Sequence, residues 1–427
     1  MTTIIDGWEQ WQEKALCITD SLDSESYSRQ VMRQGELSEC FSLKKGEAEW
    51  LLSSSYFIGV DWLDERNTAI RILPKFTSKQ GEVQINYLAM LEEALKEPKN
   101  LEHLEGLLHV DYHRPSIQIP QQDDGLSLFL VSEYLNVLAA ITRKGLKKAY
   151  YQVEENVCSK VKGKLLVSQN IKKNNARGDY SRNYSRHQEY GIDIPENQLL
   201  KKALLTASHI VEAYEHGVDM THLKNIIHTI KPKWNSVSTP NSMKPIGKGK
   251  TNTFFKEYPV ALHLARLILQ RVSVNQVMHG TKTTYTPPYW IDMSKLFEMY
   301  VLRILRQRYG NQVEYHHRFL GGQEPDYLLY GNEERPAYIV DAKYKRYGEY
   351  EVNTDDIRQV SGYCRLKTIR KELGVTDQNL IRCVIIYPDL KGYDELPSHT
   401  EWKGDGRYEE IYKVGIRLPL IDIFHSL

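Results

Sequence analysis

Two aspartates and a lysine near the end of the chain have the types and spacing of a cation-binding centre. Asp326 and Asp341 are equidistant from the middle of a polar turn at residues 331–335. If the flanking strands pair symmetrically about that turn, the two carboxylates are cross-strand neighbours roughly 5 Å apart. Lys343 lies two residues beyond Asp341 and therefore on the same face of the sheet. These residue types on one face indicate a site built around a cation.

The chemistry of such a site follows from its charges. Adjacent carboxylates repel and raise each other's pKa unless a cation lies between them. Mg²⁺ or Mn²⁺, with their preference for oxygen ligands, are the expected occupants, and the backbone carbonyl of Ala342 could complete the shell. The ammonium of Lys343 could orient the attacking water, lower its pKa, or neutralise charge in the transition state of phosphodiester hydrolysis.

Three further residues extend the constellation. Glu298 is a lone acid among apolar neighbours in the helical segment 295–300, where it is costly unless it reaches the metal or its waters. Gln359 and Tyr363 form a QxxxY element on a later helix. The alternative is a solvated hairpin face with no chemistry. The apolar residues 338–340 before Asp341 argue against it, because an uncompensated charge in a buried strand is unusual.

Composition limits what kind of protein this is. A length of 427 residues favours two or three domains, and a net charge of +1 means that any nucleic-acid surface must be local. The five cysteines are scattered without a CxxC pair, which is typical of reduced thiols in a cytosolic protein. No secretory signal is visible, and no apolar run is expected to reach membrane-spanning length. We therefore expect a cytoplasmic protein.

Residues 1–125 are predicted to form an N-terminal β-containing region. Two short apolar runs at residues 56–63 and 69–76 are separated by a polar turn, which predicts a hairpin. Residues 83–96 have helical periodicity and stop before Pro98.

Residues 126–285 are predicted to form a helical and basic middle region, with helices at 126–141, 197–216 and 260–272. The stretch 143–186 has twelve Lys or Arg and three acids, interleaved with tyrosines. It suits contact with phosphates, an acidic partner surface, or simply a solvated basic face. Residues 172–187 lack apolar periodicity and are predicted to be a long or mobile loop. A second long loop is predicted at 231–256.

Residues 286–427 are predicted to form an α/β domain with a mixed sheet. The expected order is a helix at 293–309, strands at 313–319, 326–330 and 337–344, a helix at 355–373, and a strand at 380–387. The fold class is thus α/β, as a multi-domain α+β chain.

The candidate site resembles the nuclease core of the PD-(D/E)xK superfamily, in its RecB-like and McrC-like members. The residues that carry this resemblance are Glu298, Pro325-Asp326, Asp341-Ala342-Lys343 and the Gln359/Tyr363 pair. Further matching segments occur in family order at 56–62, 70–76, 143–150, 161–165, 189–201 and 296–298. They point to the McrC family, the endonuclease subunits of McrBC-type modification-dependent (type IV) restriction systems.

The resemblance implies a C-terminal restriction-endonuclease-like domain and a Mg²⁺-dependent endodeoxyribonuclease of antiviral defence. Asp326, Asp341, the Ala342 carbonyl and Glu298 would hold metal, with Lys343 and Gln359 completing the catalytic set. It also implies a hexameric McrB-like AAA+ GTPase partner, whose hydrolysis the chain stimulates through its N-terminal part. The substrate would be double-stranded, modified DNA. The alternatives are a stand-alone RecB-like nuclease and a non-catalytic activator of an NTPase ring, since nearly three hundred residues precede the nuclease region.

Two other patterns are decoys. Residues 247–251 (GKGKT) suggest a phosphate-binding loop, but Lys244 stands where its first glycine belongs and no buried strand precedes it. The histidines at 103, 109, 113, 316 and 317 have no companion acids at metal spacing, so zinc ligation is not expected. A phosphate contact from His316 or His317 is conceivable but not favoured.

Overall fold

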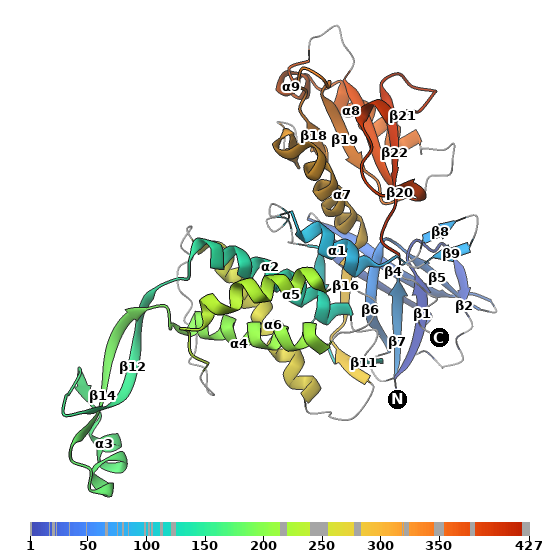
Figure 1. Ribbon diagram of the computed structural model, residues 1–427. Coiled ribbons are helices and arrows are strands. Elements are labelled where there is room, and N and C mark those ends of the chain that lie inside the picture. The colour runs from blue at the N-terminus through green and yellow to red at the C-terminus, as the bar shows by residue number, and fades with distance from the viewer. Residues whose placement is uncertain are drawn as a thin grey trace. The chain divides into compact units, whose positions relative to one another are not determined.

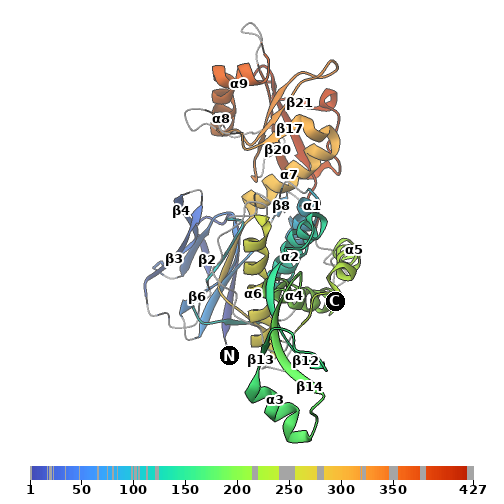
Figure 2. The same ribbon diagram turned by 90° about the vertical axis from the view of Figure 1, so that its left-hand side faces the viewer.

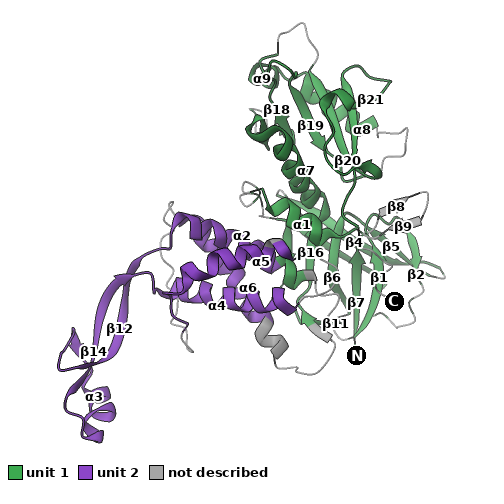
Figure 3. Ribbon diagram, viewed as in Figure 1, with its two compact units in different colours: residues 1–129, 216–219, 278–427 green, residues 130–215, 220–277 purple. Residues whose placement is uncertain are grey.

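The structure is a computed structural model with mixed α and β elements (Figure 1). It describes residues 2–420 except 17, 19–21, 23, 34, 48, 65–66, 75, 79–80, 84, 98–99, 101–102, 104–105, 112–113, 121–124, 214–219, 240–254, 277–282, 318, 320–323, 346–353 and 376–380. The chain divides into two compact units (Figure 3): residues 1–129, 216–219 and 278–427 form the first, and residues 130–215 and 220–277 form the second.

Two β-sheets with a common apolar core form the N-terminal part of the first unit. The antiparallel sheet has the order β2-β5-β4-β3, with strands at Lys14–Leu16, Trp50–Ser54, Glu36–Lys45 and Ser26–Arg33. The other has the order β1-β7-β6-β16-β10, with strands at Thr3–Trp8, Thr68–Leu73, Phe57–Asp64, Tyr289–Asp292 and Leu108–Val110. Phe41, Leu52 and Trp290 are buried where the sheets pack together.

The predicted N-terminal hairpin is confirmed, since β6 and β7 pair antiparallel with Gly59 opposite Ile72. The predicted helix is also present as α1, Tyr87–Leu95, and begins where the Asn86 side chain accepts a hydrogen bond from Ala89 N. Two small ribbons pair β8 (Phe76–Ser78) with β9 (Gly81–Val83) and β11 (Ile117–Pro120) with β15 (Thr283–Thr286). The strands of the first fifty-four residues were not predicted individually.

The second unit combines helices with a long β-hairpin. Its helices are the greater part of α2 (Gly125–Lys144) together with α4 (Pro195–Ala213), α5 (Thr221–Ile230), α6 (Glu257–Gln276) and short 3-10 turns at Asn175–Arg177 and Lys231–Trp234. Strands β12 (Ala149–Cys158) and β14 (Arg182–Gly191) form the hairpin, and β13 (Lys164–Leu165) pairs with β14. The hairpin extends away from the helices and bears α3, Val167–Lys173, at its far end (Figures 1 and 2).

The predicted loop at 172–187 is therefore wrong, because the end of α3, a 3-10 turn and half of β14 occupy it. Amide hydrogen bonds rather than apolar packing hold this segment. Asn174 is 1% exposed and exchanges hydrogen bonds of 2.8 and 2.9 Å with the side chain of Asn156. Asn174 Nδ2 also donates to Asn170 Oδ1 and to the Arg182 carbonyl. Most of the predicted 231–256 loop lies outside the described residues.

Helix α2 corrects one expectation about membranes. Residues Leu126–Lys144 are long and apolar enough, by length and composition alone, to cross a membrane. However, 78% of the qualifying window is buried within the protein, which is the behaviour of a core helix.

Glu133, on this helix, is a buried acid that makes stability depend on pH. It is 7% exposed, no described residue pairs with its carboxyl, and burial raises its pKa to about 8. The folded chain therefore holds a proton there that the unfolded chain releases above its ordinary pKa near 4.5. Stability should fall as pH rises from about 4.5 to 8.

We expect Glu133→Gln to remove this loss, stabilising the chain by about 2–4 kcal/mol at pH 8 and by almost nothing at pH 4.5. Urea unfolding at both pH values measures the difference. Glu212→Gln, at an exposed position of α4, is the matched control and should show no pH-dependent gain. An equal effect of Glu133→Gln at both pH values would contradict the protonated state.

A six-stranded mixed sheet with the order β17-β18-β19-β20-β22-β21 forms the last part of the first unit. Its strands are Val313–Tyr315, Tyr327–Leu329, Tyr338–Ala342, Arg382–Tyr393, Ile411–Ile416 and Lys403–Gly404. The helices are α7 (Met293–Tyr309), α8 (Thr354–Cys364) and α9 (Lys367–Glu372), with 3-10 turns at Gly310–Gln312 and His399–Glu401. The Ile339, Val360 and Cys383 side chains belong to a core between the sheet and α8 and α9.

The predicted α/β order of this region is confirmed, with two corrections. The single helix predicted at 355–373 is broken into α8 and α9, and the last two strands, β22 and β21, were not predicted. The four described cysteines are free thiols, as expected, although Cys364 and Cys383 Sγ lie 2.6 Å apart in this core.

Candidate active site at the end of the mixed sheet

The register of β18 and β19 brings the two predicted aspartates together. Tyr327 pairs with Val340 and Leu329 pairs with Tyr338 in an antiparallel ladder. Extending the ladder by one step places Asp326 opposite Asp341, which agrees with the symmetric pairing predicted about the turn. Asp326 Oδ2 accepts a hydrogen bond of 2.8 Å from Ala342 N, so its side chain reaches across to β19.

Lys343 and Gln359 complete a connected group. Lys343 Nζ lies 2.9 Å from Asp341 Oδ2 and 3.2 Å from Oδ1, and it donates to Gln359 Oε1 at 3.0 Å. Gln359 Nε2 in turn donates to the Tyr363 hydroxyl at 3.1 Å. Because Gln359 and Tyr363 are one helical turn apart on α8, the helix presents both to the end of β19.

Burial dominates the electrostatics of this group. It raises the pKa of Asp326 well above the ordinary value, and the charges of Asp341 and Glu298 raise it further. Burial also raises the pKa of Asp341, which is 0% exposed, against the opposing effect of Lys343. Burial acts to lower the pKa of the Lys343 ammonium, but the neighbouring carboxylates outweigh it and raise that pKa. The group therefore has more buried negative charge than its one ammonium balances.

Glu298 lies at the edge of this group and has partners of its own. One carboxylate oxygen lies 3.4 Å from both the Tyr315 hydroxyl and His316 Nε2, and the other lies 3.9 Å from Arg33 Nη2. On the far side of the ring, His316 Nδ1 contacts Glu324 Oε1 at 2.9 Å. Burial acts to lower the pKa of His316, but its two glutamate partners raise it overall.

The donor set suits a hard divalent cation. Asp341 Oδ2 is buried beside Asp326, and the Lys343 ammonium lies 2.9 Å from it without a well-aligned hydrogen bond, so this oxygen keeps room for a cation ligand. The two carboxylates and the Ala342 carbonyl are ligand types that Mg²⁺ prefers. Among the described residues, no three His, Cys, Asp or Glu side chains are grouped tightly enough to hold a metal. Glu298 is thus near the pair without being grouped with it as a third ligand.

The sequence model of one protein family, described as McrBC 5-methylcytosine restriction system component, matches residues 57–387. The chain belongs to this McrBC family. No curated protein matches the chain.

Two solved structures are similar to this McrBC-family chain. One is a refined half-complex from a tetradecameric assembly of Thermococcus gammatolerans McrB AAA+ hexamers with bound McrC. It is 16% identical in sequence, the match covers 90% of this chain and 81% of that chain, and the TM-score is 0.38. The other is the Thermococcus gammatolerans McrBC complex, with 17% identity, 60% and 67% covered, and a TM-score of 0.27.

In this McrBC-family chain, His316 contacts both Glu298 and the backbone of Asp326, which the sequence analysis did not predict. The signal was available, since His316 and Asp326 are equidistant from residue 321, just as Asp326 and Asp341 are equidistant from their turn. The structure bears this out, because His316 N donates to the Asp326 carbonyl at 2.9 Å. His316 also has a positive φ of 51°, an unusual conformation for a residue other than glycine.

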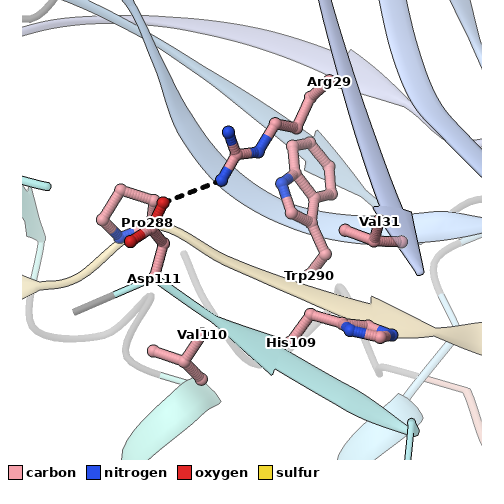
Figure 4. A pocket seen from close by; sticks show the side chains of 7 residues that line it. All are labelled: Arg29, Val31, His109, Val110, Asp111, Pro288 and Trp290. Carbon is pink, nitrogen blue, oxygen red and sulfur yellow. Dashed lines mark hydrogen bonds and ion pairs between the residues drawn. The ribbon is translucent and has the colours of Figure 1, made fainter. Parts of the chain in front are cut away.

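A pocket of about 230 Å³ lies in the N-terminal part of the first unit (Figure 4). It is lined from β3 of one sheet and from the paired strands β10 and β16 of the other. Arg29 bridges it by an ion pair of 2.9 Å with Asp111, and Trp290 and His109 form its wall. None of the predicted site residues lines it. The GKGKT decoy at 247–251 and His113 lie outside the described residues.

Proposed function

We propose that this McrBC-family chain is the Mg²⁺-dependent DNA endonuclease subunit of a McrBC-type restriction system acting in the cytoplasm. Its last region would be a PD-(D/E)xK nuclease domain that hydrolyses phosphodiester bonds of double-stranded, modified DNA. The observation that carries the proposal is the meeting of Asp326, Asp341, Lys343 and Gln359 at the end of one sheet. Family membership supports the restriction system.

Each residue has a role that its contacts support. Asp326, Asp341 and the Ala342 carbonyl would hold the metal, which when bound supplies Lewis-acid activation of water and charge neutralisation at the phosphate. Lys343, fixed between Asp341 and Gln359, would orient the water and offset negative charge that develops on the phosphate oxygens. Glu298, held by His316 and Tyr315, would support a metal-bound water or a second metal. Gln359 would keep the lysine in place.

The test is DNA cleavage by the chain assembled with an McrB-like partner, GTP and Mg²⁺. We expect cleavage by the wild type, none with EDTA, and none by Asp341→Ala. Equal rates for the wild type and Asp341→Ala would overturn the assignment. Cleavage by the purified chain alone would instead favour a self-sufficient RecB-like nuclease.

We propose further that an McrB-like AAA+ GTPase is the partner. We also propose that the β12–β14 hairpin with α3 binds it, in addition to the N-terminal region 1–125 to which the resemblance assigned docking. This arm combines the basic stretch with tyrosines that solvent reaches: Tyr150 is 72% exposed, Tyr180 79% and Tyr190 62%. The Tyr150 and Tyr190 rings also pack against each other in a tilted arrangement, with their centroids 5.1 Å apart. Tyrosines of this kind are enriched at the centres of protein interfaces.

If the arm binds the GTPase, Tyr180→Ala and Tyr150→Ala should each reduce stimulation of GTP turnover about tenfold, because losing an interface anchor costs about 1–2 kcal/mol. Tyr408→Ala is the matched control, at a tyrosine 43% exposed in the first unit. Turnover in mixtures of the two proteins measures the effect. Full stimulation by both arm variants would contradict the placement of the interface.

A further inference from the structure

The segment that follows Asp341 is held both by the nuclease sheet and from outside it. Strand β19 ends at Ala342, and Lys343 N donates to Ile386 O at 2.9 Å. Lys345 N then donates to the Lys343 carbonyl at 2.7 Å, which bends the chain sharply at Tyr344. The position of the Lys343 ammonium thus depends on what fixes Tyr344.

Tyr344 is fixed by a turn of the N-terminal sheets. Its hydroxyl donates to Glu9 Oε1 at 2.6 Å, and Gln10 Nε2 donates to the Tyr344 carbonyl at 3.3 Å. Glu9 is 0% exposed and Tyr344 is 5% exposed, so this contact is dry. A hydrogen bond from a phenol to a buried carboxyl is short and directional, and it is stronger than one at the surface.

The turn that carries Glu9 is itself rigid. Glu9 N donates to Leu73 O at 3.0 Å and Gln10 N donates to Ser55 O at 2.7 Å, so the end of β7 and the residue that follows β5 hold the turn. Ser54 Oγ accepts from Trp11 N and donates to the Trp8 carbonyl. Gln10 adopts a φ of 58°, a conformation that costs about 1 kcal/mol for a residue with a side chain. Burying an acid and keeping a strained residue here is the pattern of a support built for a particular geometry.

We propose that Glu9 is a positioning residue for the nuclease reaction and that it acts through Tyr344 to hold Lys343 over Asp341. Lys343 and Tyr344 share a peptide bond, so anchoring the side chain and the carbonyl of Tyr344 restrains the backbone from which the Lys343 side chain projects. The N-terminal sheets thereby become part of the catalytic support. This inference rests on the proposed nuclease function.

The consequence concerns control of the site. The buried contact between Glu9 and Tyr344 joins the turn after β1 to the residue next to Lys343. Any partner that shifts the turn after β1 changes the placement of the ammonium. A displacement of about 1 Å at a catalytic group is enough to alter rates by about 100-fold.

The experiment compares Tyr344→Phe and Glu9→Gln in the full chain assembled with its McrB-like partner, GTP, Mg²⁺ and DNA. Tyr344→Phe retains the ring that packs against Phe297 and removes only the hydroxyl. It should lower kcat by about 10- to 100-fold and leave KM for DNA within about twofold. Glu9→Gln, which still offers an acceptor oxygen, should retain most of the activity.

Tyr330→Phe is the matched control, because Tyr330 in the same domain also donates to glutamates, Glu314 and Glu372, away from Lys343. It should cleave at the wild-type rate. Glu9→Leu, which removes the acceptor of the Tyr344 hydroxyl, should lower kcat as much as Tyr344→Phe does. The double variant of Glu9→Leu with Tyr344→Phe should be no slower than Tyr344→Phe alone, since both act through one contact. Additive losses, or Tyr344→Phe with the wild-type kcat, would overturn the proposal.

Amide hydrogen exchange in the isolated chain gives a readout that needs neither metal nor DNA. Tyr344→Phe should speed exchange at the Lys343 amide while leaving Ile339 and Val340 protected. Equal protection of Lys343 in both proteins would overturn the proposal, and Glu9→Leu provides the same test if Tyr344→Phe does not fold. Loss of cleavage in the wild type, or its persistence in Asp341→Ala, would instead reject the underlying nuclease function.

Discussion

Asp326→Asn is expected to reduce the rate of DNA cleavage by about 1,000-fold or more and at the same time to stabilise the metal-free chain. Asparagine can still accept the hydrogen bond from Ala342 N that Asp326 accepts at 2.8 Å. What the substitution removes is one of two neighbouring buried carboxyl groups. Burial raises the pKa of both, and the charge of Asp341 raises the pKa of Asp326 further. The gain should be about 0.5–2 kcal/mol.

The pH dependence gives the sign of the effect. Both aspartates have raised pKa values in the folded chain, so above about pH 4 the folded state binds more protons than the unfolded state. Wild-type stability should therefore fall as pH rises from 4 to 8, and the Asp326→Asn variant should lose less over that range. Urea unfolding in EDTA measures both curves.

Adding Mg²⁺ should make the wild type more stable than the Asp326→Asn variant. The wild type gains stability from a cation that binds only the folded state, whereas the variant lacks one ligand and gains little. Asp356→Asn is the control: Asp356 is also buried, but it is paired with Lys345 at 2.8 Å, so its loss should destabilise the chain at neutral pH and spare most of the cleavage. A less stable Asp326→Asn variant in EDTA would show that the two carboxylates do not repel.

The candidate site could be predicted because its geometry is encoded locally. One polar turn fixes the register of Asp326 and Asp341, and alternation along a strand then places Lys343. Helix α7 was also predicted with its observed ends, because Asp292 caps its first turn, accepting from Lys295 N at 3.0 Å, and Gly310 follows its last residue.

The features that were missed depend on contacts distant in sequence. Strand β16 joins a sheet whose other strands all lie in the first 110 residues, and the support from Glu9 to Tyr344 spans 335 positions. The β12–β14 hairpin buries neither face in a core, so its period-2 signal is weak, and one part of it, residues 172–187, was predicted as a loop. Its order comes from the asparagine cluster around Asn174, which no hydrophobic pattern reveals.

Lys343→Met should reduce cleavage by about 100- to 1,000-fold and, in contrast to Asp326→Asn, destabilise the metal-free chain. Methionine keeps the apolar stem but removes the ammonium that lies 2.9 Å from the buried Asp341. Leaving a buried charge without its partner costs about 3–5 kcal/mol, and protonation of the aspartate limits that cost. The same loss of activity would thus accompany opposite changes in stability.

Lys343→Arg separates charge from geometry. It retains a cation beside Asp341, so stability should stay close to that of the wild type, yet a planar guanidinium cannot occupy the place of the ammonium between Asp341 and Gln359. Cleavage should therefore remain low, and urea unfolding together with cleavage assays measures both quantities. If Lys343→Arg cleaves at the wild-type rate, the lysine contributes only charge. If Lys343→Met is as stable as the wild type in EDTA, Asp341 is protonated and needs no partner. The pair of variants therefore decides whether Lys343 orients water or only neutralises its neighbours.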